Sequence, residues 1–250
     1  MLPRGPASKA ASSFGLWLCL GCGDSVELGN YVVWHADHET ADLSEWQAAP
    51  LGDGEVMLNA SVSKEQAHSG SYSLRLEGSG DAPMVGAGFD FNLLREAYFS
   101  AWYYLPAAYA GIIAWPILGF ASRGTGCSGP DSTCAGVEVM LRSLQSDQLL
   151  LYLFNSEPDV LQPPLSDPPV YAPIERWFFL EARYRRATDH SGRFHVWIDG
   201  QPIYGHEGWR TAEFDNLFWG INNPPSADAV LYVDDVAISQ VPVTPDGRLE

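Results

Sequence analysis

The stretch 192–204, GRFHVWIDGQPIY, decides the fold that we expect for this chain. Its apolar residues Phe194, Val196 and Ile198 alternate with a second set that consists of Arg193, His195, Trp197 and Asp199. A period of two with aromatic and β-branched residues is typical of a strand with one buried face. Asp199-Gly200 then predicts a tight hairpin turn, because both central positions of such a turn need a positive φ.

The preceding stretch 177–185, WFFLEARYR, alternates in the same way. Its apolar face consists of Phe178, Leu180, Ala182 and Tyr184, and its other face of Trp177, Phe179, Glu181, Arg183 and Arg185. Two neighbouring strands are therefore expected to present a second face of charged and aromatic side chains. That face is either a solvated surface or the floor of a binding cleft.

The rest of the chain predicts more strands and no long helix. Strands are expected at 31–35, 56–63, 72–77, 86–91, 98–105, 112–121, 137–141, 149–154, 217–221 and 230–239. With 24 Gly, 18 Pro and 12% aromatic residues, this spacing favours an all-β, two-sheet antiparallel β-sandwich. We expect one domain over 31–239, a polar C-terminal tail over 240–250, and a proline-rich loop at 156–173 that lines a binding site.

The charge of the chain argues against a nucleic-acid partner. The formal net charge is −17, and only two lysines are present, whereas a nucleic-acid-binding protein needs a basic surface. Half of the arginines fall in one region, at positions 176, 183, 185, 186, 193 and 210. This local positive charge in an acidic chain favours an anionic ligand there.

The N-terminus has the layout of an export signal. Arg4 and Lys9 precede a short apolar run at 14–20, which predicts a signal peptide over 1–22 and a secreted, cell-surface or periplasmic location. Leu20-Gly21-Cys22 resembles the bacterial lipoprotein cleavage box, in which Cys22 would carry the lipid and make the only membrane contact. The alternatives are a plain secretory signal and an unstructured tail.

Cys127 and Cys134 enclose a turn-rich loop, CSGPDSTC. In an oxidising compartment this spacing predicts a short-loop disulfide, and the alternative is two free thiols. No further Cys or His has the spacing of a zinc site.

Several segments together resemble a known superfamily. HETADLSEW (38–46), AHSGSYSLRL (67–76), LYVDDVAIS (231–239) and the strand pair described above are similar, in order and spacing, to segments of concanavalin A-like lectin/glucanase jelly rolls. That superfamily includes carbohydrate-binding modules and the polysaccharide-lyase-like group related to heparin lyase. The resemblance implies a jelly roll, but the architecture hosts lectins, binding modules, hydrolases and lyases.

The resemblance also implies a structural Ca²⁺ site, where the acidic N-terminal turn meets the last strand. Carried onto this chain, its ligands would be Asp37, Glu39 and one of Asp234 or Asp235, with carbonyls near 69–71. Several hard oxygens of this kind suit Ca²⁺. The alternative is that these acids form turns and stay solvated.

A glycan ligand would lie on the polar face of the central strands. The expected floor consists of Glu181, Arg183, His195 and Trp197, extended by Glu138 and Arg142 and bordered by Tyr103 or Trp102, Trp219 and Asn222. Aromatic rings stack on sugars, and Arg or Glu side chains bind hydroxyls or carboxylates. For each tryptophan, ordinary core packing is the alternative.

Two chemistries compete for this face. The paired carboxylates of a glucanase strand are missing, because Glu39, Asp42 and Glu45 lie in a turn without the required spacing. A lyase needs a base, an acid and a group that neutralises a uronate carboxylate, and these roles suit His195, Tyr204 or Tyr184, and Arg183 or Arg142. The usual alginate-lyase strand motifs are absent. The sequence therefore favours carbohydrate binding first, a lyase acting on an acidic glycan second, and a hydrolase or a structural or adhesive protein last, with the oligomeric state open.

Overall fold

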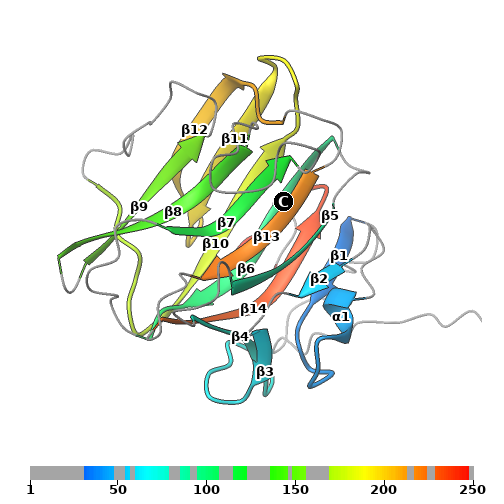
Figure 1. Cartoon of the computed structure of the whole chain (residues 1–250), viewed down its shortest axis with the longest axis vertical. Coiled ribbons are helices and arrows are strands. Elements are labelled where there is room, and N and C mark those ends of the chain that lie inside the picture. Colours follow the sequence, from blue (N-terminus) through cyan, green and yellow to red (C-terminus); the bar gives the residue numbers. More distant parts are fainter. Residues whose placement is uncertain are drawn as a thin grey trace, which may run out of the picture.

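The computed structural model describes residues 31–47, 54–56, 60–78, 85–90, 95–106, 115–122, 136–145, 148–155, 169–212, 217–223 and 229–247. Within these ranges the chain forms two antiparallel sheets, and the one helix there is the single turn α1 (Ser44–Gln47) (Figure 1). The predicted all-β sandwich is confirmed.

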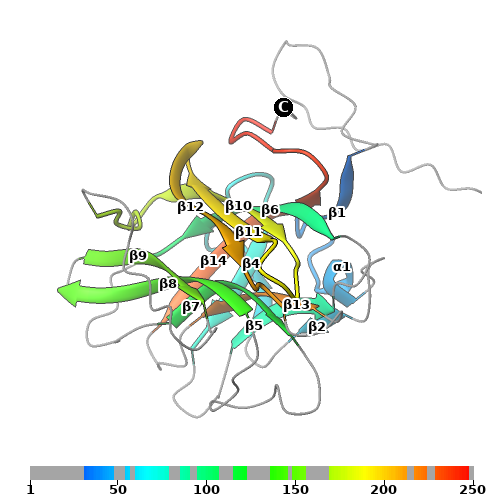
Figure 2. The same ribbon diagram turned by 90° about the horizontal axis from the view of Figure 1, so that it is seen from above.

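Sheet A consists, in spatial order, of β12 (Gln201–Trp209), β11 (Gly192–Ile198), β10 (Trp177–Arg185), β6 (Glu96–Tyr104), β14 (Val230–Ser239), β4 (Ser73–Glu77) and β3 (Ala60–Ser63), and β1 (Val32–Ala36) also pairs with β14. Sheet B consists of β2 (Gly54–Val56), β5 (Val85–Asp90), β13 (Leu217–Asn223), β7 (Trp115–Ser122), β8 (Gly136–Gln145) and β9 (Gln148–Asn155). Figure 2 shows the two sheets as layers, with sheet B along the lower side.

Aromatic side chains from both sheets fill the space between the layers. Phe120 of β7 stacks on Tyr184 of β10 with ring centroids 4.4 Å apart, and Phe99 of β6 meets Phe120 edge-on at 4.6 Å. All three side chains are buried. Burial of each side chain of this size stabilises the fold by about 1.5–3 kcal/mol. The residues predicted to face inward on these strands therefore hold the two sheets together.

The hairpin predicted from Asp199-Gly200 is confirmed. Both turn residues have a positive φ, 50° at Asp199 and 75° at Gly200, and β11 and β12 pair on either side of them. The carboxylate of Asp199 also accepts a hydrogen bond from the backbone N–H of Phe179, at 2.8 Å. The turn is therefore tied to the neighbouring strand β10.

One predicted strand is divided between the two sheets. The stretch 56–63 was expected to be continuous, but β2 ends at Val56 in sheet B and β3 begins at Ala60 in sheet A. Alternation identifies extended backbone, yet it carries no information on which sheet provides the partner strand.

The C-terminal segment 240–247 lies over the outer face of sheet A, which is the face turned away from sheet B (Figure 2). The backbone N–H of Val243 donates a hydrogen bond to Glu181 Oε2 at 2.7 Å, and Pro245 lies beside Gly200. This segment therefore covers part of the surface that the sequence predicted as a glycan floor.

Cys22, Cys127 and Cys134 lie outside the described residues, so lipidation, the signal peptide and the disulfide stay predictions. No helix in the described part of the chain has the length and apolar character needed to cross a bilayer.

Candidate functional site

The residues expected to form one glycan floor lie on two different sheets. Glu181 and Arg183 of β10 and His195 and Trp197 of β11 belong to sheet A, whereas Glu138 and Arg142 of β8 belong to sheet B. In both sheets the neighbouring residues of each strand are buried in the core between the layers. The two groups therefore face away from each other, on opposite sides of the sandwich, and the expected single floor does not form.

Two of the expected site residues lie in the core. Tyr103 is 1% exposed and stacks on Phe178, and its burial raises its pKa. Tyr204 is 4% exposed, and its hydroxyl donates a hydrogen bond to the carbonyl of Leu151 in sheet B. Neither side chain can contact a ligand on an outer face.

The predicted catalytic pairing of a tyrosine with His195 is therefore wrong. A register irregularity between Val196 and Trp197 shifts the pairing of β11 with β12, so Tyr204 stands opposite the buried Val196, and His195 stands opposite Gly205. Tyr184 is also buried, with its hydroxyl donating to the carbonyl of Thr211. Both tyrosines point into the sandwich, whereas His195 points out of it.

The cations on the outer face of sheet A are matched by carboxylates. Arg183 forms an ion pair with Glu96 at 2.6 Å, and Arg193 and His195 lie 3.6 and 4.0 Å from Glu207. Burial, and then the guanidinium of Arg183, lower the pKa of His195. Three of the six arginines that indicated an anionic ligand in the sequence, at positions 176, 183 and 193, thus lie beside an acid.

The outer face of sheet B has a strip without side chains beside Glu138. In register across the sheet, Gly88 of β5 pairs with Gly220 of β13, Gly220 pairs with Gly119 of β7, and Gly119 pairs with Glu138 of β8. We call Gly88, Gly220 and Gly119 the glycine row. Glycine has no Cβ, so this row contributes backbone only; Gly119, the member beside Glu138, is buried.

Glu138 has an unusual environment for a glutamate. Its strand neighbours Val137 and Val139 are fully buried in the core, so Glu138 projects from the outer face, where its side chain is half-buried. Burial raises its pKa to about 7. A carboxyl group with a pKa near neutrality can both take up and release a proton at physiological pH, which is the property of a general base or acid.

Arg142 lies on the same face of β8, four residues and about 13 Å along the strand from Glu138. It is exposed and forms no ion pair with any residue that the structure describes, in contrast to Arg183. A guanidinium without an acidic partner among the described residues can bind a carboxylate through two parallel hydrogen bonds.

Tyr152 of β9 completes the group: it is 9% exposed but, unlike Tyr103 and Tyr204, lies outside the core cluster, and the sequence did not single it out. It stands opposite Met140, so it is diagonal to both Glu138 and Arg142, at typical backbone separations of about 7–8 Å. Burial raises its pKa, to which Glu138 also contributes, while Arg142 acts in the opposite direction. The surrounding run 149–154, LLLYLF, is apolar on both faces, so alternation could not show that Tyr152 faces outward.

Trp219 and Asn222 are described through their backbone only. Trp219 pairs with the buried Phe120, and Asn222 pairs with Gly86 of β5, two residues along β13 from the glycine row. Ligand contacts by these two side chains stay predictions.

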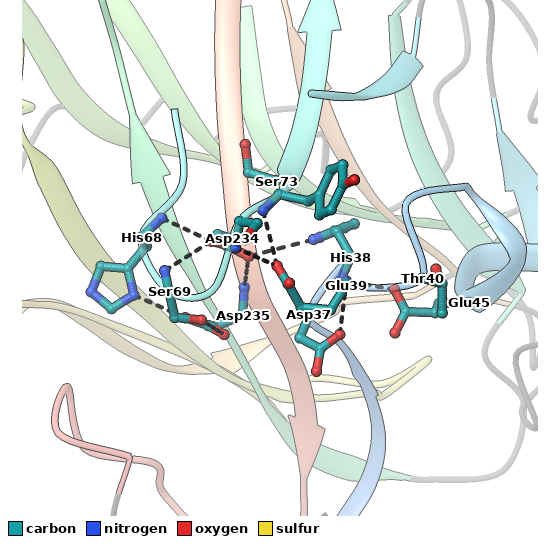
Figure 3. A network of polar contacts seen from close by, with 12 residues as sticks. Asp37, His38, Glu39, Thr40, Glu45, His68, Ser69, Ser73, Asp234 and Asp235 are labelled. Carbon is teal, nitrogen blue, oxygen red and sulfur yellow. Dashed lines mark hydrogen bonds and ion pairs between the residues drawn. The ribbon is translucent and has the colours of Figure 1, made fainter. Parts of the chain in front are cut away.

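The predicted Ca²⁺ ligands meet at a polar junction between the two ends of the chain (Figure 3). At its centre is Asp234, which is fully buried. Its Oδ2 accepts hydrogen bonds from the backbone N–H groups of His68 and Ser69, at 2.8 and 3.2 Å, and its Oδ1 accepts one from Asp235 at 2.9 Å. One carboxylate thus joins the last strand to the loop between β3 and β4.

The other three acids make similar contacts. Asp235 bonds to His68 Nδ1 and Ser69 Oγ, Glu39 Oε1 accepts from the backbone N–H groups of Ser71 and Tyr72, and Asp37 Oδ1 accepts from Glu39. The expected acids and loop therefore come together, but their oxygens face N–H and O–H donors. No cluster of three or more His, Cys, Asp or Glu side chains in the described ranges is arranged to hold a metal ion. Calcium at this junction stays a prediction.

Chelation tests that prediction. If Ca²⁺ binds the folded chain with a free concentration about 100 times its Kd, removing it is expected to lower the free energy of unfolding by about 2.7 kcal/mol. The measurement is the thermal midpoint with excess calcium and with chelator, with magnesium as the control. An unchanged midpoint would show that the acids and hydrogen-bond donors of the junction suffice without a metal.

Comparison with known proteins shows that this chain has the same fold as several solved structures of low sequence identity. Neither a family model nor a curated protein matches the chain. Among solved structures, the cellulose-induced protein Cip1 has a TM-score of 0.55 at 19% identity, over 84% of this chain and 98% of Cip1. An endo-β-1,4-glucuronan lyase from the fungus Trichoderma reesei has a TM-score of 0.54 at 12% identity, over 84% and 96% of the two chains. An alginate lyase from Aplysia kurodai has a TM-score of 0.51 at 18% identity, over 86% and 99%. The chain shares a jelly-roll fold with these proteins.

Proposed function

We propose that this protein binds an acidic polysaccharide on the outer face of sheet B and cleaves it by β-elimination at a uronate residue. The observation that carries the proposal is the combination of a half-buried glutamate with a pKa of about 7, an arginine without an acidic partner among the described residues, and a tyrosine diagonal to both. The similar folds of an alginate lyase and a glucuronan lyase support the substrate class.

Each side chain has a defined role in this reaction. Arg142 binds the uronate carboxylate, which stabilises the negative charge that develops when the adjacent C5 loses its proton. The Glu138 carboxylate takes that proton. A double bond then forms between C4 and C5, the C4–O bond breaks, and the Tyr152 hydroxyl gives its proton to the leaving oxygen. The raised pKa of Tyr152 keeps this hydroxyl protonated.

Export by the leader predicted over 1–22 would bring the protein to extracellular polysaccharides.

The test is incubation with alginate, with glucuronan and with a neutral glucan as control. The unsaturated uronate product absorbs ultraviolet light, so the expected result is rising absorbance with an acidic polymer only. Binding to these polymers without product would support the alternative, a carbohydrate-binding protein. Neither binding nor product on any uronate polymer would overturn the proposal.

Arg142→Ala distinguishes the two outer faces. Loss of a charge-assisted contact that also stabilises the developing charge is expected to lower kcat/KM about 10-fold or more, since such hydrogen bonds contribute about 1.5–3 kcal/mol. The matched control is Arg176→Ala, an exposed arginine near Asp199 on sheet A, which is expected to behave like the wild type. A loss of activity in Arg183→Ala with none in Arg142→Ala would move the site to sheet A.

A further inference from the structure

Tyr171 is a large aromatic side chain at the surface of the described part of the chain. Its side chain is 40% exposed, and the only other large hydrophobic residue of comparable exposure in the described ranges is Tyr31, at 49%. No hydrogen bond or ring contact joins the Tyr171 side chain to another described residue. A single exposed aromatic residue is common on protein surfaces, so the case for a ligand contact at Tyr171 depends on its position beside the proposed site.

The register of sheet B places Tyr171 beside the proposed site. Arg142 of β8 pairs with Leu150 of β9, and Leu150 forms an isolated antiparallel bridge with Tyr171. Leu150 is 8% exposed and does not belong to the core cluster, whereas its neighbours Leu149 and Leu151 are fully buried within that cluster. Arg142, Leu150 and Tyr171 therefore form one row on the outer face, with Tyr171 about 10 Å from Arg142 across two strand spacings.

The backbone around Tyr171 is held firmly against β9. Leu151 donates a hydrogen bond to the carbonyl of Val170 at 3.0 Å, and Ala172 donates one to the carbonyl of Leu149 at 2.8 Å. Ala172 is buried and belongs to the core cluster. Since both neighbours are fixed, the exposed ring is carried on ordered backbone at the edge of the sheet.

We infer that Tyr171 is a stacking platform for a sugar ring of the polysaccharide, at a subsite separate from the uronate held by Arg142. This inference rests on the proposed function. The face of a tyrosine ring attracts the C–H groups on the apolar face of a pyranose, and its hydroxyl stays hydrated at the edge. Tyr171 lies further from Glu138 than Arg142 does, so it contributes to binding and not to the chemical step.

A dependence on chain length follows from this geometry. An oligouronate that occupies only the sites at Glu138 and Arg142 does not reach Tyr171, whereas a longer chain that extends over β9 contacts both positions. The residue therefore favours polymers over short oligosaccharides.

The test compares Tyr171→Ala, Tyr171→Phe and the wild type on a uronate polymer and on a size series of its oligosaccharides. Loss of one aromatic contact is expected to raise KM for the polymer about 2- to 12-fold with kcat unchanged. Tyr171→Phe keeps the ring and is expected to match the wild type. Tyr31→Ala removes the other exposed tyrosine, which directly precedes β1 of sheet A, and is the control. On the shortest cleaved oligosaccharides the Tyr171→Ala effect is expected to vanish.

The outcomes separate this inference from the proposed function. If the wild type cleaves the polymer and Tyr171→Ala has the same KM, the stacking platform is wrong and the proposed reaction stands. If the wild type binds without cleaving, the same comparison is made on Kd, with the same expected ratio. A wild type that neither binds nor cleaves any uronate polymer overturns both.

Discussion

Glu138→Gln is expected to reduce the turnover of uronate polymers about 10²- to 10⁴-fold, because glutamine cannot accept the C5 proton. Binding should survive, since the amide has nearly the same shape as the carboxyl group. The measurements are kcat from product absorbance and Kd from binding to the same polymer. The matched control is Glu175→Gln, an exposed glutamate outside the site. A Glu138→Gln enzyme with wild-type kcat would remove Glu138 from the reaction.

The pKa of about 7 at Glu138 sets the expected pH profile. The base must be ionised to take a proton, so kcat/KM is expected to fall about tenfold for each pH unit below the pKa and to level off above it. A profile that is flat between pH 5 and 8 would show that another group acts as the base.

Although Glu138→Gln is expected to lose activity, it is expected to be more stable than the wild type at neutral and higher pH. Burial raises the pKa of Glu138 in the folded chain from its ordinary value of 4.5, so the folded state favours the protonated form. The contribution of Glu138 to stability is therefore fully present below about pH 4.5 and is lost as the pH rises to about 7, by up to about 3 kcal/mol. Glutamine does not ionise, so Glu138→Gln should gain this amount relative to the wild type between pH 4 and pH 8. Denaturant unfolding at the two pH values measures it, and an equal difference at both would contradict the burial of this carboxyl.

Asp234→Ala is expected to destabilise the fold by about 3–5 kcal/mol. The substitution leaves three backbone N–H groups, from His68, Ser69 and Asp235, without their acceptor in a buried site. It also removes the carboxylate that lies 3.6 Å from Nδ1 of His38, whose Nε2 already accepts a hydrogen bond from Trp46. Each unsatisfied buried group costs about 1–3 kcal/mol, so the sum supports a large effect.

The measurement for Asp234 is denaturant unfolding beside two further variants. Asp234→Asn keeps one acceptor oxygen and is expected to lose less stability, which provides a value if the alanine variant does not fold. Asp189→Ala is the control, because that exposed acid bonds only within its own turn, to Ser191. A loss at Asp234 no greater than that at Asp189 would show that the junction does not hold the chain ends together.

Local sequence determined much of the strand pattern. The alternation in 177–185 and 192–198, and the positive-φ pair Asp199-Gly200, specify a hairpin and its inward faces through side-chain period and turn chemistry alone. The acids of the junction were also recognisable, because Asp37, Glu39, Asp234 and Asp235 lie in segments that resemble those of other jelly rolls. The hairpin depends on residues that are close in the chain, and the junction was recognised from the order of motifs along the chain. Both kinds of information are present in the sequence.

The division of the candidate residues between the two sheets was decided by tertiary structure. Alternation shows that Glu138 and His195 each lie on a polar face. Strand partners, however, are determined by contacts between residues far apart in the chain. Alternation therefore could not show that β8 and β11 belong to different sheets. The same holds for Tyr204, which a register irregularity turns into the core. The raised pKa of Glu138 and the pairing of Leu150 with Tyr171 depend on burial and on bridging between distant segments. Sequence periodicity reports the two sides of a strand, whereas the site depends on which strands become neighbours.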